Sequence, residues 1–242
     1  MNTLQSPLTI VIPAKNESKL LPNLLESLCR QDYPQMRDTK VFVADAGSTD
    51  GTPELAMSFA GRLSVEVIPG GLPSVGRNAG AKKATTPFVL FIDADMELKD
   101  PTLIRRSIEL AERRNMHCVT TNIWCGRGHL ADNALYFLNN LAQYGSLLCR
   151  PFSTGMYMLF SKARFDQLGG FHENALYAED YLLSKKVANW KFGIVSGGIT
   201  TTNRRFRNMG RHRIIWLFFK TMLNTFNEDY FLHDQGYWHQ KV

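Results

Sequence analysis

The chain has 242 residues, of which 44% are hydrophobic and 21% are charged, and its formal net charge at pH 7 is +6. This composition excludes a disordered or fibrous chain and suffices for one large globular domain with a sizeable core. The longest uncharged apolar run near the C-terminus, Ile214 to Phe219, falls far short of the roughly 20 residues of a membrane-spanning helix.

Strands and helices alternate through the first half of the chain. An apolar, β-branched segment at 8–13 predicts a strand, and leucines at helical spacing over 18–31 predict a helix with Ser18 as its N-cap. Further strands are predicted at 40–46, 64–69 and 87–95, with helices over 52–63 and from residue 76 onward. Continuous apolar strands joined by helices predict a mostly parallel sheet that is covered on both faces.

The second half has a different pattern. It predicts an amphipathic helix, a strand, a long apolar-periodic helix, a strand with a helical turn and a Gly-Gly break, a helix near Glu179 and Asp180, and a final strand. In order, these segments are 100–115, 117–124, 131–148, 153–171, 174–190 and 191–197. We expect this half to extend the same sheet with mixed strands and to cover a crevice.

Three predicted strands finish in polar or acidic residues, among them Asp45, Asp93 and Asp95. The carboxyl ends of strands in such a sheet form the ligand-binding crevice. One acidic strand end is most often a solvated turn, whereas three that converge favour a ligand. Asp93 and Asp95, at positions i and i+2 of an extended segment, would lie on one side and offer oxygen ligands to Mg²⁺ or Mn²⁺.

Two loops rich in glycine and small residues lie between these strands. In the first, 45–52, Asp45 is expected to accept hydrogen bonds from a nucleobase NH or a ribose hydroxyl, and Asp50 to cap the helix that begins near Pro53. In the second, 70–80, Arg77 is placed at a helix start, where the helix end and the guanidinium together favour phosphate.

These motifs, taken together, resemble those of the family 2 glycosyltransferases, which are inverting enzymes with the GT-A fold. The matching segments, in chain order, are "IVIPAKNES", "VADAGSTDGT", "GRNAG", "FIDAD", "GGF" and "AED" followed by a helix. The match runs over roughly residues 7–195. One departure is Ala46, where many relatives carry a second aspartate.

The resemblance implies an α/β fold of GT-A (Rossmann-like) type, with a mixed, mostly parallel central sheet flanked by helices. It implies one catalytic domain over 1–203, with a nucleotide-binding half at about 1–115 and an acceptor-binding half at 116–203. Residues 204–242 would form a basic, aromatic helical extension. The donor would be a UDP- or GDP-linked sugar, the acceptor a glycan or lipid-linked hydroxyl, and the cofactor Mg²⁺ or Mn²⁺.

The resemblance also implies roles for individual residues, in three groups. Asp180 would be the general base, and Asp93 and Asp95 would coordinate the metal. The nucleotide sugar would be bound by Pro13, Ala14, Glu17, Asp45, Arg77, Asp93 and Ala94. Contacts with the acceptor or the diphosphate would come from Thr154, Gly155 and Glu179. Arg204 and Arg205, which lie beyond the match, are candidates for the same contacts because of their charge.

Other functions stay open at this point. The strand ending in Asp-x-Asp also fits an Asp-nucleophile phosphatase, although Glu97 stands where such enzymes carry Thr or Val. A sugar nucleotidyltransferase would be expected to show a glycine-rich loop after the first strand, which "IPAKNES" lacks. A non-catalytic nucleotide-binding domain is the third alternative. His129 and His172 are candidate additional metal ligands, although a lone histidine is more often a surface or packing residue.

A cluster of five arginines at 204–213 precedes the aromatic segment 213–226. Arg204, Arg205 and Arg207 are candidates to close over the diphosphate or to bind an acidic acceptor. The aromatic segment fits a helix lying in a membrane interface, with a lipid-linked acceptor. A helix packed on the core or on a dimer partner explains the pattern equally. Nucleic acid is not an expected partner, because no known motif accompanies the arginines.

The termini and the cysteines bear on localisation. The N-terminus lacks a basic region and a small-residue cleavage site, and the four cysteines form no C-x-x-C pair. We therefore predict reduced thiols in a cytoplasmic protein, with peripheral contact to the inner face of the membrane through 204–226 if the interfacial interpretation holds.

Overall fold

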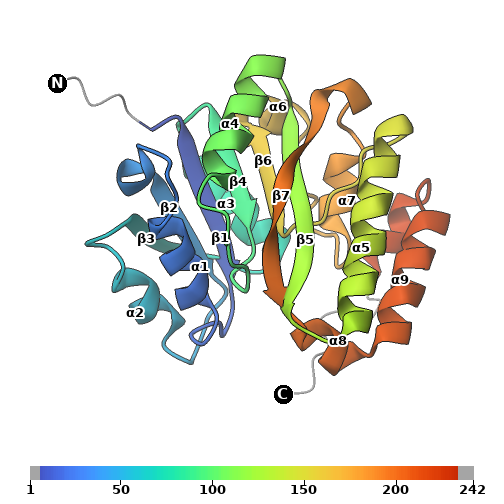
Figure 1. Cartoon of the computed structure of the whole chain (residues 1–242), viewed down its shortest axis with the longest axis horizontal. Helices are drawn as coiled ribbons and strands as arrows, with labels where there is room; N and C mark the ends of the chain where they lie inside the picture. Colours follow the sequence, from blue (N-terminus) through green and yellow to red (C-terminus); the bar gives the residue numbers. More distant parts are fainter. Residues whose placement is uncertain (1–5, 234–242) are drawn as a thin grey trace.

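The computed structural model describes residues 6–233. Residues 1–5, the beginning of the N-terminal segment in which no signal-peptide pattern was found, and residues 234–242 of the predicted extension lie outside the described residues. The described residues form a seven-stranded sheet in the order β3-β2-β1-β4-β6-β5-β7 (Figure 1). The strands are β1 (Leu8–Ala14), β2 (Lys40–Asp45), β3 (Ser64–Pro69), β4 (Phe88–Ile92), β5 (Cys118–Arg127), β6 (Tyr157–Ser161) and β7 (Phe192–Thr202).

Helices connect the strands and follow the last one. The α-helices are α1 (Leu21–Cys29), α2 (Thr52–Met57), α3 (Pro73–Lys83), α4 (Leu103–Arg114), α5 (Leu130–Gly145), α6 (Lys162–Gln167), α7 (Glu179–Ser184), α8 (Arg204–Met209) and α9 (Arg211–Leu223). Short 3₁₀ turns are η1 (Met36–Asp38), η2 (Ser146–Leu148), η3 (Asn189–Lys191) and η4 (Glu228–Leu232).

The predicted mixed, mostly parallel sheet is confirmed. β1 pairs in parallel with β2 and β4, β2 with β3, and β5 with β7, whereas β6 runs antiparallel to both β4 and β5. Because β6 is the one reversed strand among the described ones, the carboxyl ends of β1, β2, β4 and β7 all lie at the same edge of the sheet. That edge is the lower one in Figure 1.

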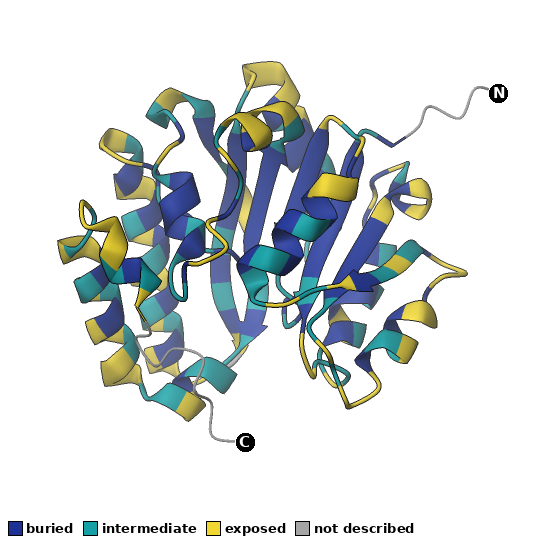
Figure 2. Ribbon diagram, turned by 180° about the vertical axis from the view of Figure 1, so that it is seen from behind, coloured by how far each residue is buried: buried dark blue, intermediate teal, exposed yellow. Residues whose placement is uncertain are grey.

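Strand residues alternate between two hydrophobic layers. On β4, Leu90 and Ile92 belong to the layer that α1, α2, α4 and α5 cover, whereas Val89 and Phe91 belong to the layer under α3, α6 and α7. Figure 2 shows the buried strands and the buried sides of the helices that face them. Both faces of the sheet are therefore covered, which explains why the strand sequences are continuously apolar.

Some predicted boundaries are wrong. Ser18 is not an N-cap, because α1 begins at Leu21 after Leu20; its amide instead hydrogen-bonds Asp50 Oδ2 at 3.0 Å. Pro22 does lie in the first turn of α1, as expected. Asp50 stands one residue before the Gly51 cap of α2, yet its Oδ1 accepts the Thr52 amide at 3.1 Å.

Other segments differ in length from the predictions. The helix expected within 174–190 begins near Glu179 as predicted, but it ends at Ser184. The helix expected over 131–148 ends at Gly145 and continues as a 3₁₀ turn. The last strand, expected to end at Gly197, runs on to Thr202. Its pairing with β5 shifts between Thr121 and Ile123, where β7 accommodates the Gly-Gly pair as a bulge.

The C-terminal extension is helical over the described residues. On α9, Leu217 and Thr221 are buried against the rest of the protein, whereas Trp216 and Phe219 are about half exposed. The helix therefore packs on the core with one side and leaves the other uncovered. Within residues 6–233, no helix combines the length and the apolar character needed to cross a membrane.

Candidate active site

The loops after β1 and β2 are joined by hydrogen bonds between backbone and side chains. The Asn16 amide donates to Ser48 Oγ at 2.8 Å, and Asn16 Oδ1 accepts the Thr49 amide at 2.9 Å. The Glu17 amide donates to Thr52 Oγ1 at 2.9 Å. Asn16 takes a left-handed φ of 53°, which asparagine tolerates better than most residues. These bonds make the two loops one unit at the carboxyl edge of the sheet.

Asp45 ends β2 directly opposite Ala14, the last residue of β1. Its Oδ2 accepts the amides of Gly47 and Ser48 at 3.1 and 3.0 Å, which fixes the side chain. Its Oδ1 is buried and has no hydrogen-bond partner within the described part of the chain. A buried acceptor without a partner is costly, so this atom is available for a donor group of a ligand that lies against Ala14 and Pro13.

Asp93 and Asp95 follow β4, but they do not lie on an extended segment as predicted. The strand ends at Ile92, and residues 93–96 form a turn in which the Met96 amide bonds the Asp93 carbonyl. Ala94 between them is buried. The two carboxylates remain close enough that burial first, and then the Asp93 charge, raise the pKa of Asp95.

Arg77 does not lie at a helix start, because α3 begins four residues earlier at Pro73. The residue is 2% exposed. Its Nη2 donates to Asp93 Oδ1 and its Nη1 to Glu179 Oε1, both at 2.6 Å, and the guanidinium lies 5.2 Å from the centre of the Phe171 ring. Arg77 therefore connects the end of β4 to the start of α7.

Gly155 fits between these groups because it has no side chain. A Cβ there would lie 2.6 Å from Arg77 Nη2. Its carbonyl accepts Arg77 Nη2 at 3.5 Å, and its amide donates to Asp180 Oδ2. Beside it, Thr154 Oγ1 is buried and has no partner in the described region. The loop before β6 thus links the arginine to Asp180.

Asp180 lies in the first turn of α7, after Ala178 in a left-handed conformation. Its Oδ1 accepts the Tyr181 amide at 2.7 Å. Burial and then the charge of Glu179 raise the pKa of Asp180 to about 7, although Arg77 opposes the shift. A partly accessible carboxyl that gains and loses its proton near neutral pH has the property needed in a general base.

Arg204, at the start of α8, bridges two other acidic residues of the site. It forms a two-point ion pair with Glu17 and places Nη2 3.4 Å from Asp95 Oδ2. Burial raises the pKa of Glu17 in spite of this partner. Arg205 is near enough for its charge to oppose the rise in the pKa of Asp95. The first two residues of the extension therefore belong to the site.

Among the described residues, no group of three or more His, Cys, Asp or Glu side chains is arranged to hold a metal ion. Asp93 meets Arg77 through Oδ1 and Asp95 meets Arg204 through Oδ2, so the second oxygen of each is outside these ion pairs. Two hard oxygen donors fit Mg²⁺ or Mn²⁺ when phosphate and water complete the shell. His129 instead caps α5, and His172 lies near Glu228.

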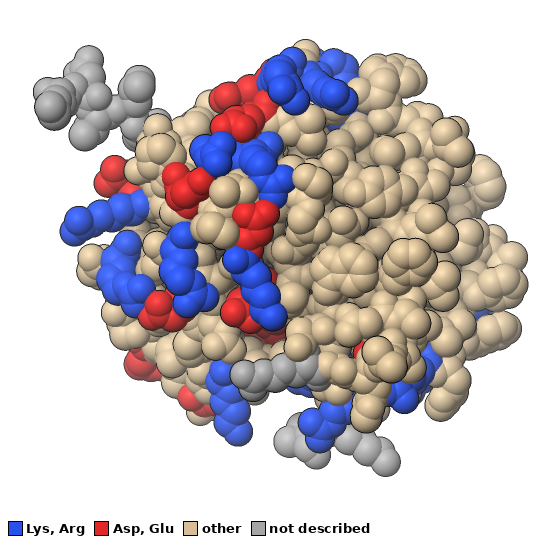
Figure 3. Space-filling view, in the orientation of Figure 1, with Lys and Arg blue, Asp and Glu red and all other residues tan. Residues whose placement is uncertain are grey.

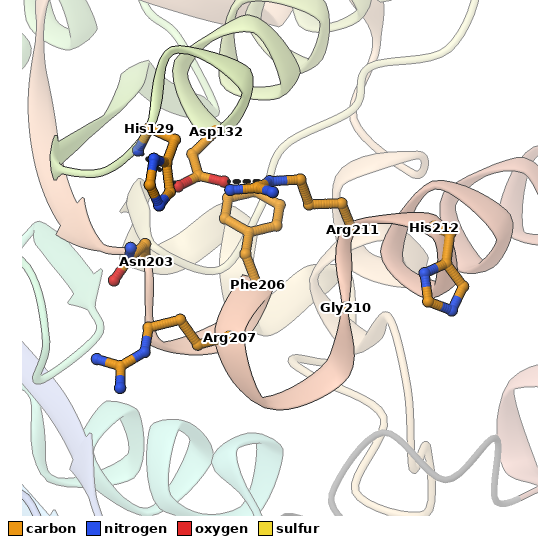
Figure 4. Close-up of a pocket in the computed structure, with 8 residues that line it drawn as sticks. All are labelled: His129, Asp132, Asn203, Phe206, Arg207, Gly210, Arg211 and His212. Carbon is orange, nitrogen blue, oxygen red and sulfur yellow. Dashed lines mark hydrogen bonds and ion pairs between the residues drawn. The ribbon is translucent and has the colours of Figure 1, made fainter.

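A pocket of about 450 Å³ adjoins the site at the start of α5. Figure 4 shows the paired side chains of Asp132 and Arg211 in its wall, with Nε to Oδ1 at 2.7 Å, next to Phe206 and His129. Asn203, which precedes Arg204, also lines the pocket. The pocket therefore lies between the start of α5 and the α8–α9 junction, next to Arg204 in the sequence.

Some residues near the site escaped the sequence analysis. Thr201 places its hydroxyl 3.5 Å from Asp95 Oδ2, because β7 continues beyond its glycine bulge. Tyr177 precedes the acidic pair, and burial raises its pKa to about 12. The β-branched run Ile199–Thr202 is a sequence signal for a strand that includes Thr201. The Gly-Gly pair before it hides this signal, because glycines there suggest that the strand has ended.

Comparisons with known proteins agree with this architecture. Poly(ribitol-phosphate) β-N-acetylglucosaminyltransferase TarS of Staphylococcus aureus is 33% identical over 99 residues, 39% of this chain and 17% of TarS. The 4,4′-diaponeurosporenoate glycosyltransferase of Staphylococcus haemolyticus is 26% identical over 203 residues, 81% of this chain and 50% of that protein. The chain thus spans half or less of these curated relatives.

The fold is shared with a mannosyltransferase of Pyrobaculum calidifontis, solved with GDP-Man and Mn²⁺. The TM-score is 0.69 at 20% identity, over 92% of this chain and 65% of that one. The family model described as glycosyl transferase family 2 matches residues 9–168, a range that includes both loops, Arg77, the Asp93–Asp95 turn and Gly155. The chain therefore belongs to glycosyl transferase family 2.

Proposed function

We propose that the protein is a metal-dependent, inverting glycosyltransferase that moves a sugar from a nucleoside diphosphate, UDP or GDP, to an acceptor hydroxyl. The observation that carries this proposal is Asp180, a residue of intermediate exposure in the first turn of α7, whose pKa is raised to about 7 by burial and by the charge of Glu179. Through Gly155 and Arg77 it is connected to Asp93 at the end of β4. A base and an acidic pair thus border one site.

The loop unit after β1 and β2 is the proposed nucleoside site. Asp45 Oδ1, buried and without a partner in the described region, would accept a hydrogen bond from a nucleobase NH or a ribose hydroxyl. Pro13, Ala14 and Glu17 border the same position. The proposal does not distinguish uracil from guanine, because either base offers an NH donor.

The diphosphate is proposed to lie next to Asp93, Asp95 and Arg204. Asp93 and Asp95 would hold Mg²⁺ or Mn²⁺, which when bound neutralises charge that develops on the leaving diphosphate. Arg204 now pairs with Glu17 and Asp95, and its guanidinium suits a phosphate equally well. We propose that Arg204 transfers one of its contacts to the diphosphate, with Arg205 beside it.

The proposed reaction is one displacement. Asp180 takes the proton of the acceptor hydroxyl while the oxygen attacks the anomeric carbon, and the bond to the diphosphate oxygen breaks with its electron pair. Because the base and the leaving group lie on opposite sides of the sugar, the configuration at that carbon is inverted. Thr154 and Gly155 would line the acceptor side, and Glu179 would hold Arg77 in place.

The acceptor itself is a glycan or lipid-linked hydroxyl in this proposal. The relatives named above act on poly(ribitol-phosphate) and on 4,4′-diaponeurosporenoate, which differ in chemistry. Because these two acceptors differ, neither relative indicates which acceptor this protein uses.

The test is nucleoside diphosphate release from a panel of UDP- and GDP-sugars with Mn²⁺ or Mg²⁺. The Asp180→Asn variant should lose at least about 100-fold in turnover, the usual contribution of a general base, while nucleotide-dependent thermal stabilisation is retained. Asp166→Asn, which removes a surface partner of Lys162, is the matched control. Unchanged turnover in Asp180→Asn, or pyrophosphate or free phosphate as the product, would contradict the proposal.

A further inference from the structure

Two helices at one side of the molecule expose their apolar side chains. On α5 the exposed residues are Leu130, Phe137, Leu138, Leu141 and Tyr144, and on α9 they are Ile215, Trp216, Phe219, Met222 and Leu223. We call these ten residues the α5/α9 face. In Figure 3 the surface over these helices is almost free of charged side chains. Contiguous exposed apolar surface of this kind marks an interaction site.

The two helices form one surface. Asp132 at the start of α5 pairs with Arg211 at the start of α9, and the Tyr136 ring of α5 lies 5.4 Å from that of Phe206 on α8. Figure 1 shows α5 and α9 running side by side along the same flank of the sheet. Their uncovered sides therefore belong to a single patch.

The patch extends past both helices. Leu148 in η2 is 88% exposed and Trp190 in η3 is 75% exposed, and these two short turns lie against each other. Phe226, just after α9, is 82% exposed and stacks on Arg150 with a guanidinium-to-ring distance of 4.6 Å. The exposed apolar residues thus continue around the ends of α5 and α9.

The inner side of α9 is firmly attached, so the outer side is not left bare by a loose helix. Thr221 Oγ1 donates to the Tyr177 hydroxyl at 2.9 Å, and the Tyr181 hydroxyl donates to Thr225 Oγ1 at 3.0 Å. Phe218 packs on Phe152 with ring centres 5.6 Å apart. The helix is anchored on the segment that carries Asp180, and the apolar residues that it contributes to the α5/α9 face lie on the opposite, exposed side.

The exposed charges on α5, α8 and α9 are basic. The sequences of α5, α8 and α9 contain one carboxylate, Asp132, which is fully buried and paired with Arg211. Arg207, Arg211 and Arg213 are exposed at the junction of α8 and α9. Lys220 lies 5.5 Å from the Trp216 ring. An apolar surface with aromatic residues and bordering cations complements anionic headgroups above an acyl region.

We propose that the α5/α9 face docks on a lipid bilayer that contains anionic lipid, with both helices lying in the plane of the interface. α9 has 13 residues and is about 20 Å long at 1.5 Å per residue, shorter than a bilayer core of about 30 Å. A second copy of the chain fits the patch less well. A twofold contact would bring the same arginines of two copies together, without carboxylates on these helices to pair them.

The experiment is flotation of the full chain with vesicles of phosphatidylcholine, with and without 30% phosphatidylglycerol. We expect binding to the anionic vesicles, weaker binding to the neutral ones, and a decrease as salt is raised. The double variant Leu138→Glu and Phe219→Glu should lower the partition at least tenfold, because it places charge on both helices. Met57→Glu is the matched control, because Met57 is as exposed but lies on α2.

A second variant separates the electrostatic contribution. Arg207→Gln with Arg213→Gln should lower binding to anionic vesicles severalfold and leave binding to neutral ones unchanged. Far-UV circular dichroism establishes that each variant is folded. Absence of wild-type flotation, or equal flotation of the double glutamate variant, overturns the proposal. So does light scattering that finds a dimer which the glutamate substitutions dissociate. These measurements use no nucleotide sugar and record no turnover, so their result does not depend on the proposed reaction.

Discussion

Replacing Arg77 by methionine should destabilise the protein far more than removing a surface arginine with similar contacts. Arg77 is 2% exposed and faces two carboxylates, Asp93 and Glu179. Burial alone would lower its pKa, and the charges of Asp93, Glu179 and Asp180 raise it instead. Methionine keeps most of the volume but removes the cation, so two largely buried carboxylates lose their partner.

The expected cost follows from this burial. Removing one partner of a buried ion pair lowers the free energy of unfolding by about 3–5 kcal/mol. For a domain of this size, each 1 kcal/mol shifts the melting temperature by about 2–4 °C, so the expected decrease is roughly 6–20 °C. The matched control is Arg62→Met. Arg62 makes two short contacts with Glu26 at the surface, and such exposed pairs contribute at most about 1 kcal/mol.

The assay is thermal unfolding followed by circular dichroism. The Arg77→Met, Glu179→Gln double variant should recover part of the loss. Equal melting temperatures for Arg77→Met and Arg62→Met would refute the reasoning, since burial would then make no difference to the ion pair.

Three further predictions concern the site. kcat/KM should fall with decreasing pH below about 7, because the base must be unprotonated and Asp180 gains its proton there; a pH–rate profile flat from 5 to 8 would contradict this. Gly155→Ala should lower the free energy of unfolding by about 1–3 kcal/mol through overpacking, because the new methyl group would lie 2.6 Å from the Arg77 guanidinium. A denaturant titration measures this loss. Gly145→Ala, with nothing within 4 Å of the added Cβ, is the control and should show no loss. Arg204→Gln should weaken nucleoside diphosphate binding about tenfold or more, because a charge-assisted contact is lost. Calorimetry measures the affinity. An undiminished affinity would exclude the proposed transfer of an Arg204 contact to the diphosphate.

Much of the fold was predictable because its signals are local. Apolar strands such as 8–13 and 40–46 can be recognised from a few consecutive residues. The parallel pairing of the strands then brings Asp45 and Asp93 to one edge of the sheet. That convergence requires only the order of strands and helices. The position of Asp180 in the first turn of a helix followed from the acidic pair and the apolar residues behind it.

What could not be predicted depends on long-range contacts. Arg77 is separated from Glu179 by 102 residues, and no local pattern distinguishes a buried arginine that connects two carboxylates from one that binds phosphate. The end of β7 was missed for a related reason. A glycine pair ends most strands, and only the pairing with Thr121 and Ile123 of β5 carries this one through a bulge to Thr202.

The C-terminal extension contacts the proposed active site and also carries part of the α5/α9 face. Arg204, its first residue, contacts Glu17 and Asp95 in the proposed donor site, and α9 begins seven residues later at Arg211. Thr221 on the inner side of α9 bonds Tyr177, and Thr225, just after the helix, bonds Tyr181. These two tyrosines border the Glu179–Asp180 pair. A helix held on a bilayer by its outer side would therefore keep the base and the donor arginine beside the headgroups. An acceptor anchored in that leaflet could then reach Asp180 without its apolar part entering water.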